Sequence, residues 1–234
     1  MKNIYIFFVS LLCCSYSAIA DEPVLPPRNG GLTVGVDLSR FLLPLIELDR
    51  SGWEVSLDYQ LSTRAYAVAE LGYQRVKDFN RSNYTYNSTG NYLRFGVDKV
   101  LFSLNDTKGD VLFSKKVTRD HDYMYTGIRY GFSSMSQNAS YILSDNTFGS
   151  AEGEERNSIN THWLEGVVGF KVEVFKNLFL GISTRIRYGL AVPKQTNVPH
   201  YINAGYGNGR NQLNVGYTYA IFYRIPFGQL KEPQ

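Results

Sequence analysis

Near its carboxyl end the chain alternates between two kinds of residue, from Leu213 to Ile225 (LNVGYTYAIFYRI). The odd positions are large and apolar or aromatic, and the even positions are small or polar, apart from Phe222. Because successive side chains of a β-strand point to opposite sides, this period of two predicts an extended strand with two unlike faces. The apolar face points either into the core of a soluble protein or outward into lipid.

Seven further stretches carry the same alternation, and no long helical period competes with them. Most of the eight reach or approach the ~9–11 residues that a tilted strand needs to cross a bilayer. In chain order the predicted strands are Leu32–Ser39, Trp53–Leu61, Ala65–Arg75, Tyr92–Leu101, Tyr123–Ser133, Trp163–Val174, Leu178–Leu190 and Leu213–Ile225.

The connections between these strands are unequal in a regular way. Tight turns follow the second and sixth strands, at Ser62–Arg64 and Phe175–Asn177, whereas longer polar loops such as Met135–His162 and Ala191–Asn211 follow the odd-numbered strands. Short turns on one side and long loops on the other are typical of outer-membrane barrels, in which the short turns are periplasmic. The fourth connection, Phe102–Asp122, is the exception, because it is long and charged on the side where turns are normally tight.

The two faces of the predicted strands differ in chemistry. One face is apolar and places aromatic residues such as Trp53, Tyr73, Tyr188 and Tyr223 toward strand ends, as in the girdles at lipid–water boundaries. The other face is rich in glycine and holds seven acidic and six basic residues, whose charges nearly cancel. These are Asp37, Glu54, Asp58, Glu70, Arg94, Asp98, Arg129, Glu165, Lys171, Glu173, Arg185, Arg187 and Arg224.

This charged face indicates which side of the sheet is enclosed. Buried charges are costly unless they are paired, so a closed interior requires near-neutrality, whereas a surface in water does not. We therefore predict an all-β fold: a closed, antiparallel, eight-stranded transmembrane barrel with its apolar face in lipid. An interior of that size holds only side chains, so we expect a filled lumen and not a pore. The alternative is a soluble, secreted, lipocalin-like barrel with the apolar face inside.

The first twenty residues have the features of a secretory signal peptide. Lys2 precedes an apolar run from Ile4 to Cys14, and an A-x-A pattern ends at Ala20. The predicted organisation is a signal peptide at 1–20, a periplasmic lead-in at 21–31, the barrel at 32–227 and a tail at 228–234. Both cysteines of the chain lie in the signal peptide, so the mature chain has no thiol chemistry.

The rest of the composition excludes other classes of partner. Without Lys2 the chain carries 23 basic and 21 acidic residues, which gives no reason to expect a nucleic-acid partner. No loop has calcium-binding spacing, and we expect neither a metal nor a cofactor.

Several blocks of sequence resemble a known family. They include the stretches 34–40 (VGVDLSR), 92–98 (YLRFGVD), 127–134 (GIRYGFSS) and 162–165 (HWLE). Together they resemble a Bacteroidota family of outer-membrane β-barrels, filed as domain of unknown function 6048. The resemblance covers essentially the whole mature chain and implies a fold and a location in the outer membrane. It implies no activity or catalytic residues; an association with outer-membrane assembly machinery is a further expectation.

A lipid-modifying outer-membrane enzyme, such as an acyltransferase or deacylase, is the alternative function. It would need a histidine on the outer side with a serine and a carboxylate within reach. The best available set is His162 with Glu165 and Ser158. We expect His162 to be a rim residue without chemistry, and therefore no enzymatic activity.

Two segments fit a solitary barrel poorly and suggest a protein partner in the outer membrane or periplasm, besides the membrane lipid. The first is an apolar run in the first outer loop, where such residues would be costly if exposed. The second is the fourth connection, where apolar residues are flanked by charges of both signs. The possible contact residues are Phe41, Leu42, Leu43, Leu45, Ile46, Val111, Leu112 and Phe113.

Overall fold

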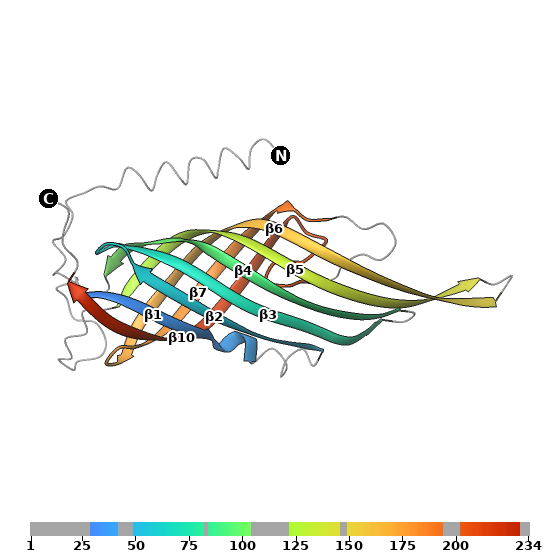
Figure 1. Ribbon diagram of the computed structural model, residues 1–234, viewed down its shortest axis with the longest axis horizontal. Coiled ribbons are helices and arrows are strands. Elements are labelled where there is room, and N and C mark those ends of the chain that lie inside the picture. The colour runs from blue at the N-terminus through green and yellow to red at the C-terminus, as the bar shows by residue number, and fades with distance from the viewer. Residues whose placement is uncertain are drawn as a thin grey trace.

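A computed structural model of the protein describes residues 29–41, 49–81, 84–103, 122–145, 149–193 and 202–229. These residues form a closed, antiparallel, eight-stranded barrel and one small separate hairpin (Figure 1). The barrel strands are β1 (Asn29–Asp37), β2 (Arg50–Gln60), β3 (Ala65–Arg81), β4 (Tyr84–Ser103), β5 (Tyr123–Asp145), β6 (Gly149–Phe175), β7 (Leu178–Ala191) and β10 (Leu213–Gln229); β8 (Ile202–Asn203) and β9 (Gly207–Asn208) form the hairpin.

Each barrel strand pairs with its neighbours in the sequence, and β1 pairs with β10 to close the ring. The start of β1 lies beside the end of β10, since Asn29 is paired with Gln229. Both tight turns lie at this same end, which we call the turn end; the opposite end is the loop end. The predicted fold class is therefore confirmed.

The turns at the turn end are built as their sequences suggest. Lys176 and Asn177 alone separate the paired residues Phe175 and Leu178, and Asn177 has a φ of 64°. Asparagine tolerates this left-handed conformation better than most residues. In the turn after β2, the Ser62 hydroxyl accepts a hydrogen bond from the amide of Ala65 at 3.1 Å.

All eight predicted strands are present, but several are longer than the alternation suggested. β1 begins at Asn29, inside the predicted lead-in, and β10 continues to Gln229, two residues into the predicted tail. Residues 1–28 and 230–234, including the predicted signal peptide, lie outside the described residues.

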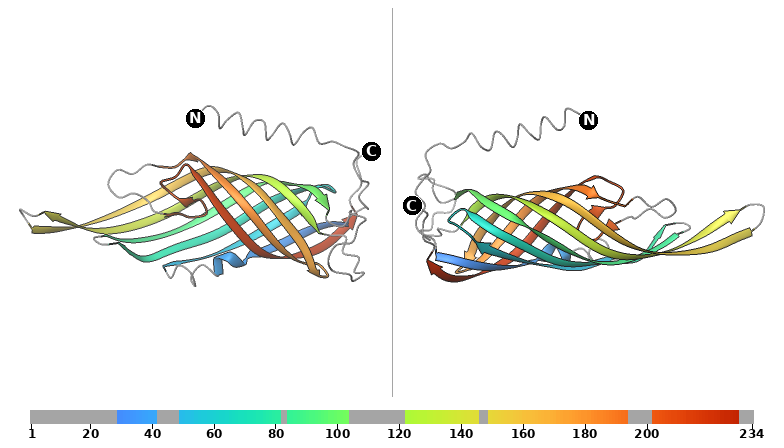
Figure 2. Two further views of the ribbon diagram at one scale, coloured as in Figure 1. Left: turned by 180° about the vertical axis from the view of Figure 1, so that it is seen from behind. Right: turned by 45° about the horizontal axis from the view of Figure 1, so that its top comes forward.

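The prediction of long loops after the third and fifth strands is wrong. Only residues 82 and 83 separate β3 from β4, and most of Met135–His162 belongs to β5 and β6, which remain paired from Ser134↔Asn160 to Asp145↔Gly149. Figure 2 shows these strands running on beyond the barrel as a ribbon. This segment was predicted as a loop because its outward positions are polar. Its strands have one apolar face, on which Met135 and Ile159 are buried, whereas Ser134 and Asn160 are exposed.

The apolar side of every strand faces outward. Leu71, Phe95, Ile128 and Ile182 each expose about half of their surface or more, and the charged side chains point into the barrel. The soluble alternative, with the apolar face inside, is therefore wrong. Aromatic residues stack on this outer surface, as in the pair Trp53 and Tyr73, whose rings are 6.5 Å apart. The described residues include no helix with the length and hydropathy of a membrane-spanning segment.

Glycines on the inner face make room for large side chains. A Cβ atom on Gly131 would lie 2.1 Å from the ring of Trp163, which is fully buried, and one on Gly72 would lie 2.1 Å from the ring of Tyr92. Gly166 is on the outer face and has no atom within 4 Å of that position. The glycines therefore allow each aromatic ring to lie over the neighbouring strand of the inner wall.

This difference predicts opposite effects for two matched substitutions. We expect Gly131→Ala to destabilise the barrel by about 1–3 kcal/mol, because the added methyl group overpacks against Trp163. Gly166→Ala should be neutral or stabilising, because alanine restricts the unfolded chain more than glycine does. Urea unfolding in lipid vesicles, followed by tryptophan fluorescence, measures both. Equal losses in the two variants would contradict the packing argument.

Candidate functional site

The interior of the barrel holds a network of buried ions. The structure buries all thirteen charged residues of the predicted inner face, and none exposes more than 9% of its surface. Alternation explains this arrangement, since residues two apart on a strand share a face. The network lies on all eight barrel strands: Asp37 on β1, Glu54 and Asp58 on β2, Glu70 on β3, Arg94 and Asp98 on β4, Arg129 on β5, Glu165, Lys171 and Glu173 on β6, Arg185 and Arg187 on β7, and Arg224 on β10.

Arg94 lies at the centre of the network and has no exposed surface. Its guanidinium forms ion pairs with Glu54, with Glu70 at 3.1 Å and with Glu165 at 3.3 Å. The Tyr92 hydroxyl donates a hydrogen bond to Glu54 at 2.5 Å, and the Tyr92 ring lies 4.9 Å from the Arg94 guanidinium. One cation therefore joins carboxylates from three other strands.

Arg185 binds the same three carboxylates from the opposite wall. It lies 2.7 Å from Glu70, 3.1 Å from Glu165 and 3.7 Å from Glu54. Arg187 adds a further ion pair with Glu165 at 3.1 Å. Each glutamate thus meets more than one guanidinium, which compensates the cost of removing its charge from water.

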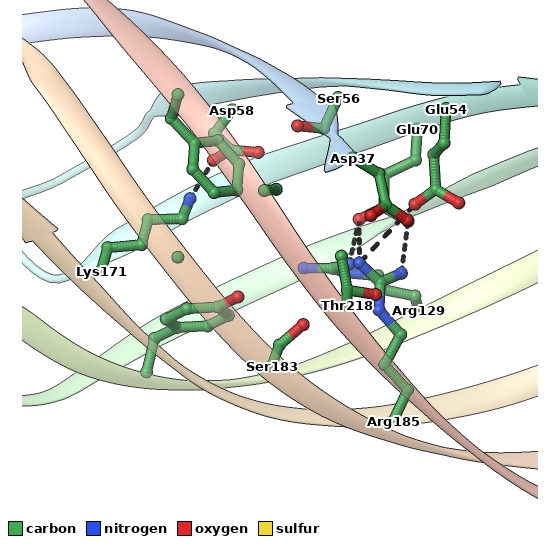
Figure 3. Close-up of a pocket in the computed structure, with 14 residues that line it drawn as sticks. Asp37, Glu54, Ser56, Asp58, Glu70, Arg129, Lys171, Ser183, Arg185 and Thr218 are labelled. Carbon is green, nitrogen blue, oxygen red and sulfur yellow. Dashed lines mark hydrogen bonds and ion pairs between the residues drawn. The ribbon is translucent and has the colours of Figure 1, made fainter. Parts of the chain in front are cut away.

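Two more cations, with three ion pairs, extend the network toward the turn end. Arg129 pairs with Glu70 and, at 2.8 Å, with Asp98. Lys171 pairs with Asp58, and its ammonium lies 4.1 Å from the centre of the Phe222 ring. Figure 3 shows the Lys171–Asp58 pair apart from the guanidinium cluster.

The remaining predicted residues also have hydrogen-bond partners. Arg224 donates a hydrogen bond to Gln60 at 3.0 Å, and Glu173 accepts one from the amide of Asn177 in the β6–β7 turn at 2.7 Å. Asp37 accepts hydrogen bonds from both the amide and the hydroxyl of Ser39.

Arg40 belongs to the network but was not predicted from the sequence. A helical turn over residues 38–41 follows β1, and the Asp37 carboxylate caps it by accepting a hydrogen bond from the amide of Ser39. This turn directs Arg40 into the lumen, 3.5 Å from Asp37 and 3.4 Å from Glu54. With Arg40, seven cations face the seven buried carboxylates of the described residues.

Little free space remains among these side chains. A cavity of about 20 Å³ lies between the guanidinium cluster and the Lys171–Asp58 pair, with Ser56, Ser183 and Thr218 in its lining (Figure 3). That volume admits only one or two water molecules. In the described part of the chain, the barrel interior around this cavity is filled by side chains.

The connection between β7 and β10 folds back into the barrel at the loop end. Its β8–β9 hairpin buries Ala204 and Tyr206 completely or almost so, and the Tyr206 ring packs against Trp163 at 5.7 Å. Arg187 donates a hydrogen bond to the Tyr206 carbonyl at 3.3 Å, and the Gly205 amide donates one to Gln74 at 3.3 Å. Burial raises the pKa of the Tyr206 phenol, which donates to main-chain carbonyls. The hairpin therefore closes the mouth above the ion network.

The residues of the alternative enzymatic site do not come together. His162 faces outward, where its ring nitrogen contacts the Tyr130 hydroxyl at 2.5 Å and its ring lies 4.9 Å from that of Phe132. Glu165 points into the lumen, whereas Ser158 is exposed outside. A histidine and a carboxylate on opposite faces of one strand cannot share a proton.

The predicted contact segments are described only in small part. Phe41 exposes 55% of its surface at the end of the helical turn, whereas Leu42, Leu43, Leu45 and Ile46 lie outside the described residues. Phe102, the first residue of the predicted fourth connection, belongs to β4. Val111, Leu112 and Phe113 of that connection lie outside the described residues. Within the described ranges, no three His, Cys, Asp or Glu side chains are grouped so as to hold a metal ion.

Comparison with known proteins identifies one matching family and several solved β-barrel structures that are similar to this chain. A family model described as "Domain of unknown function (DUF6048)" matches residues 3–230. No curated protein sequence matches the chain.

Similar solved structures include Ail, the attachment invasion locus protein of Yersinia pestis, with 10% identity, 86% of this chain and 100% of that chain covered, and a TM-score of 0.40. The N-terminal β-barrel domain of Pseudomonas aeruginosa OprF has 13% identity, with 86% and 100% covered and a TM-score of 0.38. Neisserial surface protein A has 13% identity, with 85% and 95% covered and a TM-score of 0.37.

The ion network predicts a large effect for its central residue. We expect Arg94→Met to destabilise the barrel by about 3–5 kcal/mol, because it leaves Glu54, Glu70 and Glu165 with an uncompensated buried charge. Arg210→Met, which makes the same change at an exposed position, should alter stability by less than about 0.5 kcal/mol. Unfolding in vesicles compares the two variants.

A second substitution tests whether charge is the cause. Adding Glu54→Gln to Arg94→Met removes one stranded carboxylate and should recover part of the lost stability. If the double variant loses as much stability as the sum of the two single ones, the ion pairs are not coupled as the geometry requires.

Proposed function

The chain belongs to the family described as domain of unknown function 6048, and on that premise we propose that it is a non-catalytic integral protein of the bacterial outer membrane. In this proposal its lumen is filled, and residues 1–20 are cleaved as the chain crosses the inner membrane of a Bacteroidota cell. The barrel is a structural or accessory subunit of an outer-membrane complex. The turn end faces the periplasm.

The observation that carries the membrane location is the exposed apolar band around a charged interior. On β4 the outward positions between Asn91 and Lys99 are Leu93, Phe95 and Val97, which expose between 43% and 55% of their surfaces. Eight residues of strand correspond to about 26 Å, or about 20 Å along the axis of a barrel whose strands tilt by ~35–45°. This height is close to the ~25 Å apolar band of outer-membrane barrels.

The filled interior supports a role without catalysis or transport. A lumen closed by ion pairs and by the β8–β9 hairpin leaves the wall and the two rims as the surfaces that can act. At the turn end, the connection 102–122 combines apolar residues with charges of both signs in its sequence. That combination suits a polar-rimmed protein contact, and we propose it as the contact with a periplasmic or neighbouring membrane protein.

Detergent dependence tests the membrane location. We expect the mature chain to require detergent, and to migrate differently on gels with and without heating because the folded barrel resists denaturation. A mature chain that stays monodisperse in buffer without detergent would contradict the membrane location.

A deletion tests the role in a complex. We expect that replacing residues 104–121 by a tight turn leaves heat-dependent migration unchanged but removes at least one protein from an affinity purification of solubilised outer membranes. The control variant keeps every connection at its full length and carries only the substitution Lys176→Gln, which lies at the same end of the barrel. If the shortened barrel inserts normally and retains every co-purifying protein, residues 104–121 do not form the proposed protein contact.

A further inference from the structure

The outer surface of strands β3 to β6 changes from apolar to polar at a single height. The last mainly apolar row across the sheet consists of Leu71, Leu93 and Phe132, with His162 beside them in register. One step farther toward the loop end, the next row consists of Tyr73, Asn91, Ser134 and Asn160. The change occurs on neighbouring strands together, so it marks a level of the barrel and not a local irregularity.

Two more rows continue this polar surface. The first consists of Arg75, Thr89, Ser136 and Ser158, all of which are exposed. The second consists of Asn87, Asn138 and Arg156. We call these three rows, from the Tyr73 row to the Asn87 row, the polar outer face.

The chemistry of the polar outer face is uniform. Its centre consists of serine, threonine and asparagine, whose hydroxyl and amide groups both donate and accept hydrogen bonds. Arg75 on β3 and Arg156 on β6 carry positive charge at opposite margins. The three rows contain no carboxylate; one row beyond, the register sets Glu154 beside Ser140.

The sheet behind this face is held in place. Val76, Tyr86, Met135 and Ile159 on its inner side each expose 3% of their surface or less. The Tyr86 hydroxyl also donates to the carbonyl of Ile202 in the β8–β9 hairpin at 3.4 Å. Polar groups on such a packed sheet keep fixed spacings, which reduces the entropy lost when a ligand binds.

From this arrangement we infer that the polar outer face binds the phosphorylated saccharide headgroup of a membrane-anchored glycolipid, whose acyl chains lie against the apolar wall below it. The inference rests on the proposed outer-membrane location. Sugar hydroxyls complement the serine and asparagine side chains, and phosphate groups complement Arg75 and Arg156, since guanidinium binds phosphate through paired hydrogen bonds.

Continuity with the apolar wall favours an anchored ligand over a soluble saccharide. The polar face begins directly above Phe132 and His162 on the same strands, so a lipid packed on the wall places its headgroup there without leaving the surface. From Ser134 to Asn138 the face extends over about 13 Å of strand, so it can contact several groups of an extended saccharide headgroup.

The composition argues against a protein partner on this face. Protein interfaces depend on buried aromatic, aliphatic and arginine anchors at their centres. Here the centre consists of small polar side chains, and the aromatic residue Tyr73 is already stacked on Trp53 at the boundary.

Binding of a defined glycolipid to the purified barrel tests the inference. The delipidated protein in detergent is titrated with rough lipopolysaccharide, with phosphatidylglycerol, and with the lipid-free core oligosaccharide of the same lipopolysaccharide. We expect the lipopolysaccharide to bind more tightly than the other two and to raise the Tm of the barrel. Heat-dependent gel migration confirms that each protein used is folded.

Two variants and a control locate the site. Arg75→Gln with Arg156→Gln, and separately Asn91→Ala with Ser134→Ala and Ser136→Ala, should each weaken lipopolysaccharide binding by about tenfold or more. Lys99→Gln with Lys176→Gln makes the same change of charge at the turn end and should leave binding unchanged.

The outcomes separate this inference from the proposed function. If folded, detergent-dependent variants bind lipopolysaccharide as tightly as the unaltered protein, the polar outer face is not the site, although the membrane location stands. If the free oligosaccharide binds as tightly as the lipopolysaccharide, the ligand is not membrane-anchored. A protein that needs no detergent overturns both proposals.

Discussion

The ion pairs that join opposite walls of the barrel determine what the rest of this structure can be. Arg94 reaches across from β4 to Glu54 on β2 and Glu165 on β6, and Arg185 reaches from β7 to Glu70 on β3. Guanidinium groups of this length meet their carboxylates only in a narrow lumen, and their charges are tolerated there only because they are compensated. Because charged side chains fill this lumen, the large apolar side chains of the strands face outward. The medium around the barrel wall must therefore be one in which apolar groups are stable.

The fold and much of the interior could be predicted because one rule governs both. Strict alternation assigns each residue to a face, so a charge such as Glu70 and its partner Arg129 could be assigned to the same side before any contact was known. The rule failed where its signal weakens: serine and asparagine alternating with a few apolar residues in 134–160 looked like loop, although the buried Met135 and Ile159 keep the strand period.

Other features depend on contacts that no local pattern encodes. Arg40 enters the lumen because a helical turn after Asp37 changes the direction of the chain, and a period of two says nothing about such a turn. The β8–β9 hairpin is held by contacts such as the one between Gly205 and Gln74, which are 131 residues apart. The Trp163 ring lies over β5 because Gly131 on that neighbouring strand leaves room for it, a relation that requires knowing the register.

The way in which the barrel closes has a consequence for its biogenesis. Residues of the ion network that contact each other are far apart in the chain, as are Arg185 and Glu70, separated by 115 residues. Until β1 meets β10 the sheet is open, and the ion pairs that join distant strands, such as Arg185 with Glu70, have no enclosed lumen in which to form. The lumen therefore cannot be enclosed before β10 has been made, and a chain truncated before β10 leaves its ionic face open. Such non-local closure is slow, and during this delay the nascent wall, apolar on its outside, needs shielding until the seam is made.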